Sequence, residues 1–296
     1  MIPSFPDSRP IGLSDKPLFD KLFKDLQPEI SEFTFTNLFS WQEAYGFKIS
    51  QKGDFLIIRF LREDNEYFLD PIGRENSKNV IKDCLEKFPN AKFVRLPFST
   101  AVLFNNETAF KAIEDRDNFD YLYRRKDLIE LKGKKYDAKR NFIRRFFNLY
   151  KPVCRKATPA DVEQCIRFHN QWCDDKSCEQ DAGLRREKQA ILKMLKNCQQ
   201  LALSGAIIEI DGRIQAFSIG EPLNHTTFVI HAEKANSKFI GIYQAINNFF
   251  ASLIPENFEF VNREQDLGID NLRKAKTSYQ PASFVKKFTV FKIDKE

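Results

Sequence analysis

Hydrophobic positions in the first half of the chain recur with periods that change from helical to extended. Four prolines between residues 3 and 17 favour an extended lead-in, and a helix opened by Asp15 and closed by Pro28 follows. A second helix is expected over residues 33–45. Alternating apolar residues predict a hairpin over 47–60 and a third strand over 66–69. The remaining elements expected here are a helix at 79–88, a strand at 92–96, short helical pieces at 100–104 and 107–113, and β segments at 119–123 and 128–131.

The second half echoes this order loosely, after a helical pattern over residues 134–150. Lys151-Pro152 ends that pattern, and a short strand with a helix start at Thr158-Pro159 begins a new unit. We therefore expect two domains, residues 1–150 and residues 151–296, of the α/β class with mixed α+β sheets. The later elements expected are a helix at 184–198, a hairpin of 203–210 with 213–222, a strand at 226–232, a helix at 237–253 and a strand at 284–293 that closes the second sheet.

Composition favours a globular chain with two cores. The 296 residues suit two domains of about 150 each, and 42% of the residues are hydrophobic, with 30 phenylalanines. The sequence has no run of about eighteen apolar residues and no secretory leader pattern, so a cytoplasmic protein without a transmembrane segment is expected. Its six cysteines are then expected to be reduced.

Positive charge is concentrated between Arg124 and Lys156. Thirteen basic and three acidic residues give this segment a charge of +10, whereas the whole chain carries +6. The helical period over 134–150 puts five apolar residues on an inner side: Tyr136, Phe142, Ile143, Phe146 and Phe147. Five basic residues lie elsewhere on the helix and are candidates for contact with the phosphates of tRNA or of an anionic membrane: Lys135, Lys139, Arg140, Arg144 and Arg145. The alternative is a solvated helix that only connects two domains.

The most distinctive stretch is residues 258–281. It starts with a β-type run and then turns polar, and the two-residue period places Asn262, Glu264 and Asp266 on one strand face. The helix that follows is expected to carry Leu272 and Ala275 inward and to present Arg273 and Lys276, and it stops at Tyr279 before Pro281. A strand end followed by a solvated helix, on which Asp270 pairs with Lys274, is the alternative interpretation.

Three stretches together resemble a known family. They are Glu-Gln-Asp-Leu-Gly at 264–268 with Leu272, Arg273, Lys276, Tyr279 and Pro281; Gly-Lys-Lys-Tyr-Asp-Ala-Lys-Arg-Asn at 133–141; and His-Ala-Glu-Lys-Ala at 231–235 with Gly241, Tyr243 and Asn247. The pattern is similar to that of the phosphatidylglycerol lysyltransferase C-terminal domain family. The resemblance implies two tandem acetyltransferase-like (GNAT, Fem-type) domains, and its membrane-bound members move an aminoacyl group from tRNA to a lipid.

The resemblance suggests an acyl- or aminoacyl-transferase that acts on an amine or a hydroxyl, on a small molecule or a lipid. Glu233 or Glu264 is then the expected base and Tyr279 the expected acid. Five residues are expected to bind substrate: His231, Asn262, Asp266, Arg273 and Lys276. A satisfied core histidine at 231 and a salt-bridge partner at Glu233 would instead suit a non-catalytic ligand-binding or regulatory protein on the same fold.

Two cofactor questions remain open in the sequence. In acetyltransferase-like folds the coenzyme A phosphates lie at a glycine-rich helix start, which Lys238, Gly241 and Tyr243 occupy here. Because one glycine remains and Tyr243 is bulky, acyl-coenzyme A and aminoacyl-tRNA are both kept as candidate donors. Cys165, His169 and Cys173 share a helix face with zinc-like spacing, but they coincide with an apolar stripe, so no metal is expected.

Overall fold

The chain forms two compact units in a computed structural model that describes residues 1–293. The first unit comprises Met1–Asp120, Gln265–Arg273 and the segment that begins at Phe284. The second comprises Tyr121–Glu264 and Lys274–Ser283. The chain therefore contributes to each unit more than once.

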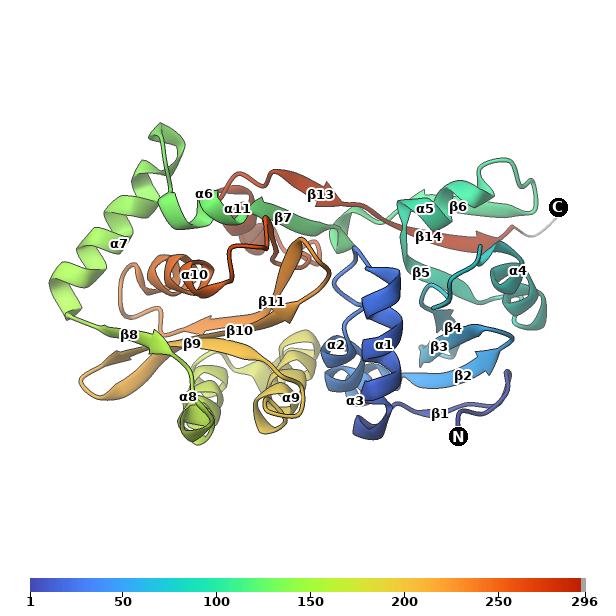
Figure 1. Cartoon of the computed structure of the whole chain (residues 1–296), viewed down its shortest axis with the longest axis horizontal. Helices are drawn as coiled ribbons and strands as arrows, with labels where there is room; N and C mark the ends of the chain where they lie inside the picture. The colour runs from blue at the N-terminus through green and yellow to red at the C-terminus, as the bar shows by residue number, and fades with distance from the viewer. Residues whose placement is uncertain (294–296) are drawn as a thin grey trace. The chain divides into compact units, whose positions relative to one another are not determined.

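The first unit is built on a seven-stranded sheet. Its strand order is β1 (Arg9–Pro10), β2 (Lys48–Lys52), β3 (Phe55–Arg62), β4 (Asn65–Phe68), β5 (Lys92–Pro97), β14 (Lys287–Lys292) and β6 (Phe110–Glu114). Only β4 and β5 run parallel among these pairs. The helices of this unit are α1 (Lys16–Leu26), α2 (Phe35–Ser40), α3 (Gln42–Tyr45), α4 (Lys78–Lys87) and α5 (Phe98–Ala101). Figure 1 shows β14, in red, between β5 and β6.

The second unit has a sheet of the same size. Its order is β13 (Ser283–Val285), β7 (Asp120–Arg124), β12 (Phe260–Asn262), β11 (Thr227–Ala235), β10 (Arg213–Pro222), β9 (Ser204–Ile210) and β8 (Val153–Lys156). The helices are α6 (Arg125–Glu130), α7 (Asp137–Tyr150), α8 (Val162–Asp175), α9 (Ala182–Lys196) and α10 (Ile242–Leu253), and α11 (Asp270–Thr277) carries the chain from the first unit into the second. In Figure 1, α10 covers one face of β9 to β11, and α8 and α9 cover the other.

The two sheets repeat one pattern of strand pairing. In each, three antiparallel pairings lead to a single parallel pairing, β4 with β5 and β11 with β12, and an antiparallel strand follows. Each unit also has its own core, with Phe68, Phe93 and Val290 in the first and Tyr121, Phe228 and Ile246 in the second. The predicted fold class, mixed α/β with two units that each hold a mixed sheet, is confirmed.

The strands divide the chain differently from the predicted domains. β7 precedes residue 150 but belongs to the second sheet, and β14, predicted to close the second sheet, lies in the first. Pairing partners cause this difference, since β14 pairs with both β5 and β6 along nearly its whole length. A local pattern of apolar residues identifies a strand without identifying its neighbours.

Two short elements were predicted with the wrong type. Residues 107–113, expected to be helical, contain β6, an edge strand with exposed side chains and little apolar alternation. Residues 128–131, expected to be extended, lie mostly in α6, where Leu128 is fully buried and Leu131 ends the helix with φ +48°. In a short apolar run, the helical period and the two-residue period of a strand cannot be told apart, and packing decides whether the segment is a helix or a strand.

The basic helix α7 packs on α10 through a narrower face than predicted. Tyr136 and Phe146 are buried, but Phe142 and Phe147 are 42% and 41% exposed. Their predicted place on the inner side is wrong, because only the side of α7 around Phe146 meets the core. The helix therefore shows solvent both arginines and phenylalanines.

Short 3-10 turns complete the described elements, at Leu13–Asp15, Val102–Phe104, Arg116–Asn118, Lys134–Tyr136, Pro159–Asp161 and Cys178–Gln180. Within residues 1–293, no helix has the length and apolar character that crossing a membrane requires.

Candidate active site

The candidate site lies where β11 and β12 stop pairing. These parallel strands pair from Thr227 with Phe260 to Val229 with Asn262, and β11 then continues to Ala235 without β12. After Asn262 the chain turns sharply, with φ +54° at Glu264. Asn262, Glu264 and Asp266 therefore do not share one strand face, as the two-residue period had predicted. The strand β12 ends at Asn262, although the alternating polar pattern continues to Asp266.

Two of the predicted residues stabilise that turn. The buried Asn262 side chain accepts a hydrogen bond from the Glu264 amide at 2.7 Å, which is the geometry of an Asx turn. Lys276 is buried as well, and its ammonium group donates to the carbonyl oxygens of Arg263 and Glu264 at 2.5 and 3.0 Å. Ala275, predicted to face inward, is exposed instead. Lys276 thus fixes the backbone that carries Arg263.

Arg263 and Glu233 form an ion pair at the centre of the cluster. Arg263 Nη2 donates to Glu233 Oε1 at 3.2 Å, and the Asn247 amide of α10 donates to Glu233 Oε2 at 3.1 Å. The two charged side chains are 15% and 11% exposed, so they are accessible at their edges. Arg263 Nη1 and Asn247 Oδ1 are buried and have no hydrogen-bond partner among the described residues. One donor and one acceptor therefore remain for another group.

Tyr279 forms an aromatic wall of this cluster. The guanidinium of Arg263 lies 5.0 Å from its ring centre, and Lys139 Nζ lies 4.3 Å from it. Burial raises the pKa of the Tyr279 phenol above its usual range, against the opposing effect of Arg263. Lys139 also donates to Ser278 Oγ at 2.7 Å, and burial lowers the pKa of its ammonium group. Lys139, predicted on the outer basic face, is thus part of the cluster.

His231 is enclosed between two carboxylates. Its Nε2 donates to Glu221 at 2.9 Å and its Nδ1 to Glu264 at 3.0 Å, and its side chain has no exposed surface. Burial alone would lower the pKa of His231, but the two hydrogen-bonded carboxylates raise it to about 9. The charged ring ties β10, β11 and the Glu264 turn together, which favours a positioning role.

Asp266 and Arg273 belong to the first unit and form a separate network there. Arg273 donates to both Asp266 oxygens at 2.8 and 2.9 Å and to Asp117 at 2.7 Å. The Asp266 side chain is fully buried, and it also accepts from the Gly268 amide at 2.9 Å and pairs with Arg116 at 3.3 Å. Their contacts stabilise the loop before α11, and a role in substrate binding stays a prediction.

The start of α10 packs closely on α7. Gly241 has φ +94°, and a Cβ there would lie 2.4 Å from the Phe142 carbonyl oxygen of α7, so the α7 backbone occupies the side where a side chain would stand. The Tyr243 hydroxyl accepts from Trp172 Nε1 at 3.3 Å, and the exposed Lys238 pairs with Asp175 at 3.6 Å. Gly241 is needed for helix packing, whereas a phosphate site needs several free amides in the open.

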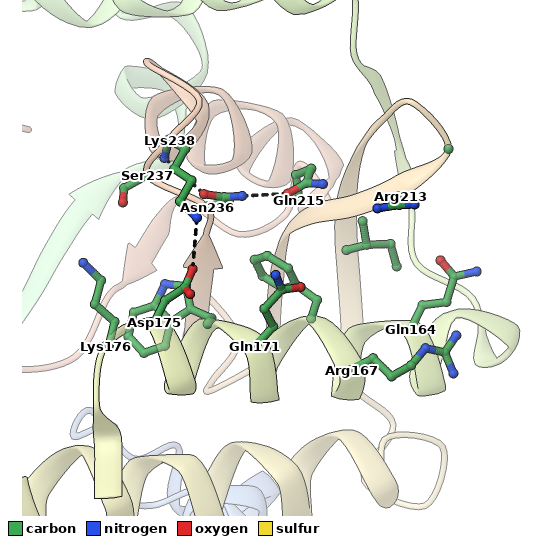
Figure 2. Close-up of a pocket in the computed structure, with 14 residues that line it drawn as sticks. Gln164, Arg167, Gln171, Asp175, Lys176, Arg213, Gln215, Asn236, Ser237 and Lys238 are labelled. Atoms are coloured by element: carbon green, nitrogen blue, oxygen red, sulfur yellow. Dashed lines mark hydrogen bonds and ion pairs between the residues drawn. The ribbon is translucent and has the colours of Figure 1, made fainter. Parts of the chain in front are cut away.

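Apart from the Glu233 cluster, the second unit has a hollow on the α8 side of its sheet (Figure 2). It has a volume of about 760 Å³ between α8, the turn at Gly212 and the end of β11. Figure 2 shows Asn236 bonded to Gln215, at 3.0 Å, and Lys238 beside Asp175. Its lining has one acidic residue, Asp175, and four basic residues: Arg167, Lys176, Arg213 and Lys238. Glu233 faces α10, on the other face of the sheet, so the hollow and the Glu233 cluster are distinct.

The thiols of α8 are buried in its apolar face. His169 Nε2 lies 3.8 Å from Cys173 Sγ, and burial raises the pKa of Cys165 and Cys173 to about 12. No group of three His, Cys, Asp or Glu side chains within residues 1–293 is arranged to hold a metal ion.

Sequence reasoning missed the centre of the cluster. Arg263 stands between Asn262 and Glu264, and the two-residue period assigned it to the opposite face. Asn247 belongs to the pattern that carries the family resemblance, and no sequence pattern marks Glu221. The signal available was the position of Arg263 at a predicted strand end, next to polar residues.

Comparisons with known proteins agree with this fold. The family model described as phosphatidylglycerol lysyltransferase, C-terminal, matches residues 23–291. A conserved protein of unknown function from Bacteroides thetaiotaomicron is 34% identical, with 99% of this chain and 100% of that chain covered and a TM-score of 0.90.

Two further solved structures resemble this chain in fold at low sequence identity. L-PGS from Bacillus licheniformis is 15% identical with a TM-score of 0.67, over 100% of this chain and 95% of that one. The C-terminal domain of a putative lysylphosphatidylglycerol synthetase from Agrobacterium fabrum is 12% identical with a TM-score of 0.63, over 94% and 92%. With nearly its whole length matched by the family model, this chain belongs to the phosphatidylglycerol lysyltransferase, C-terminal, family.

Proposed function

We propose that this protein is an aminoacyl- or acyl-transferase whose reaction centre is the Glu233–Arg263–Tyr279 cluster of the second unit. The observation that carries the proposal is the buried Arg263 Nη1, a cationic donor with no hydrogen-bond partner among the described residues. It lies on the side chain that already holds Glu233 in place. A transfer to an amine or a hydroxyl needs such a donor beside a base.

The three side chains suit an ester aminolysis or transesterification. Glu233 takes the proton from the attacking amine or hydroxyl, and a new bond forms to the donor's carbonyl carbon. Arg263 Nη1 stabilises the negative oxygen of the tetrahedral intermediate. When the ester bond breaks, the leaving oxygen takes a proton from the Tyr279 phenol, and the proton on Glu233 returns to the phenolate through solvent. The raised pKa of Tyr279 keeps this acid protonated at neutral pH.

We propose an aminoacyl ester on a phosphate-bearing carrier as the donor. The start of α10 has one glycine, Gly241, with the Phe142 backbone against it and the bulky Tyr243 two residues on, which favours a donor other than coenzyme A. Two basic surfaces of the second unit suit a polyanion instead: the exposed Arg144 and Arg145 of α7, and the hollow of Figure 2. The family description adds phosphatidylglycerol as an acceptor to test and lysine as an aminoacyl group to test.

The assay measures transfer of a radiolabelled aminoacyl group from a mixture of aminoacyl-tRNAs to phosphatidylglycerol vesicles or to soluble amines. We expect Glu233→Gln and Arg263→Lys to lower kcat by roughly 10²–10³-fold each. Glu233→Gln removes the base, and Arg263→Lys keeps the positive charge but removes the guanidinium whose Nη1 would donate to the oxyanion. Tyr279→Phe should slow poor leaving groups most. Glu256→Gln changes an exposed glutamate of the same unit and should leave transfer unchanged.

Full activity in both Glu233→Gln and Arg263→Lys would remove this cluster from the chemistry. If the unmodified protein transfers nothing from any aminoacyl-tRNA but binds one of these compounds, the fold serves as a ligand-binding module.

A further inference from the structure

The first unit has a cavity of its own where its parallel strands separate. We call the point where such a parallel pair stops pairing a fork; the candidate active site lies at the fork of β11 and β12. The cavity has a volume of about 500 Å³ and lies where β4 and β5 stop pairing, after Phe68 opposite Phe93. The C-terminal end of α1, the loop from Asp70 to Ser77 and the start of α5 form its walls. In both units a carboxylate follows the fork on the strand that enters it, Asp70 after β4 and Glu233 on β11. The repeated topology thus brings an acid to both forks.

Asp70 is held in place by neutral partners. Thr100 Oγ1 donates to its Oδ2 at 2.9 Å, and Ser77 Oγ approaches its Oδ1 at 3.4 Å. Among the described residues no lysine, arginine or histidine is bonded to it. Burial raises the pKa of Asp70 to about 7, and the two hydroxyl groups only partly offset this effect. Asp70 is half-buried, and a carboxylate withdrawn from water without a cation is costly, so a cationic ligand would relieve that cost.

The rest of the cavity combines negative charge with apolar walls. Glu29 and Glu75 line it with Asp70, whereas Arg74 is the one basic residue in the lining and is paired with Asp25. The Phe23 and Phe33 rings stack with centres 5.8 Å apart, and Ile30, Ile72 and Leu103 complete an apolar wall. Three acids against one paired base favour a cationic ligand over an anionic one, and the wall favours a hydrocarbon chain.

We propose that this cavity binds a small free primary amine with an apolar chain. Its ammonium group lies on the Asp70 carboxylate, and its chain lies along Phe23 and Phe33. The site is separate from the Glu233 cluster, and nothing in the transfer proposed above depends on it. The first unit is therefore a ligand-binding unit in its own right.

The test is titration calorimetry on the intact chain with n-hexylamine, and with 1-hexanol and hexanoate as probes of the same length. Of these three compounds, we expect only n-hexylamine to bind saturably. Asp70→Asn keeps the size of the side chain and one acceptor oxygen but removes the negative charge, and it should weaken binding by more than tenfold. Asp83→Asn is the matched control, because Asp83 is an exposed acid of the same unit outside the cavity.

The pH dependence adds a second signature. With a pKa of about 7, Asp70 should be about nine-tenths ionised at pH 8 and about one-tenth at pH 6, so the affinity should fall roughly tenfold between them. The other ionisable residues of the lining are Glu29, Arg74 and Glu75. They are unchanged in both Asp70→Asn and Asp83→Asn, so any pH dependence that they cause appears in both variants.

Amide NMR shifts in the unmodified protein locate the site without any variant, and we expect them at residues 70–77 and 97–103. Absence of saturable n-hexylamine binding, equal binding by 1-hexanol, or unchanged affinity in a folded Asp70→Asn would each overturn the proposal.

Discussion

The enclosed His231 should make the stability of this protein fall as the pH rises above neutrality. The folded-state pKa of about 9 exceeds the unfolded value of 6.5, so the folded state binds the proton more tightly. The stabilisation is complete below pH 6.5 and is lost as the pH rises through 9. The difference corresponds to about 3 kcal/mol in the free energy of unfolding, at 1.36 kcal/mol per unit.

The assay is urea unfolding between pH 6 and pH 10 for the unmodified protein and for His231→Gln. Other groups titrate in both proteins, so the contribution of His231 is the difference between the two curves. We expect His231→Gln to be less stable at pH 6, because Glu221 and Glu264 lose the cation between them, and the gap should shrink by about 3 kcal/mol towards pH 10. His225→Gln, at an exposed turn, is the matched control.

Histidine NMR measures the same quantity directly. His231 should titrate near pH 9, whereas His169 should titrate near pH 4, because its burial, together with the charge of Lys234, lowers the pKa. A His231 midpoint at or below 6.5, or a gap between the curves that does not change with pH, would refute the reasoning.

Two further predictions concern α7. Gly241→Ala should destabilise the protein by about 2 kcal/mol more than Gly133→Ala in urea unfolding, because both glycines have φ near +90° but only Gly241 faces the Phe142 backbone; equal losses would exclude the contact as the cause. The double variant Arg144→Glu with Arg145→Glu should reduce the salt dependence of tRNA binding, measured by fluorescence anisotropy, with the slope of log K against log salt becoming shallower by roughly 2, and an unchanged slope would exclude this surface from tRNA binding.

The long elements of the fold were predictable from the sequence because their patterns are long. The helix opened by Asp15 forms as expected at α1, and the hairpin of β9 with β10 turns at Asp211-Gly212, where both residues have positive φ. Strand partners were not predictable, since a strand such as β14 has the same alternation wherever it pairs. The expected domain boundary at residue 150 rested on the break at Lys151-Pro152, whereas β7 already belongs to the second sheet.

The residues of the candidate site were predictable as a neighbourhood, but their individual partners were not. The polar stretch after Val261 indicated the segment that carries the cluster, although its pattern predicted a continuing strand where the chain turns. Its internal geometry depends on one side chain, Asn262, that ends the strand, and the two-residue period assumed that the strand continued. The burial of Lys276 was equally hidden, because a lysine at that spacing is usually solvated.

The position of β14 has a consequence for synthesis on the ribosome. Lys287 pairs with Pro97, a separation of 190 residues, so the first sheet lacks one strand until very late in translation. At typical elongation rates this leaves β5 and β6 without their shared neighbour for about 10 to 40 s. Every strand of the second sheet is made before β14. The unit that is synthesised first is thus completed last, and during that interval its two open strand edges need protection from pairing with other nascent chains.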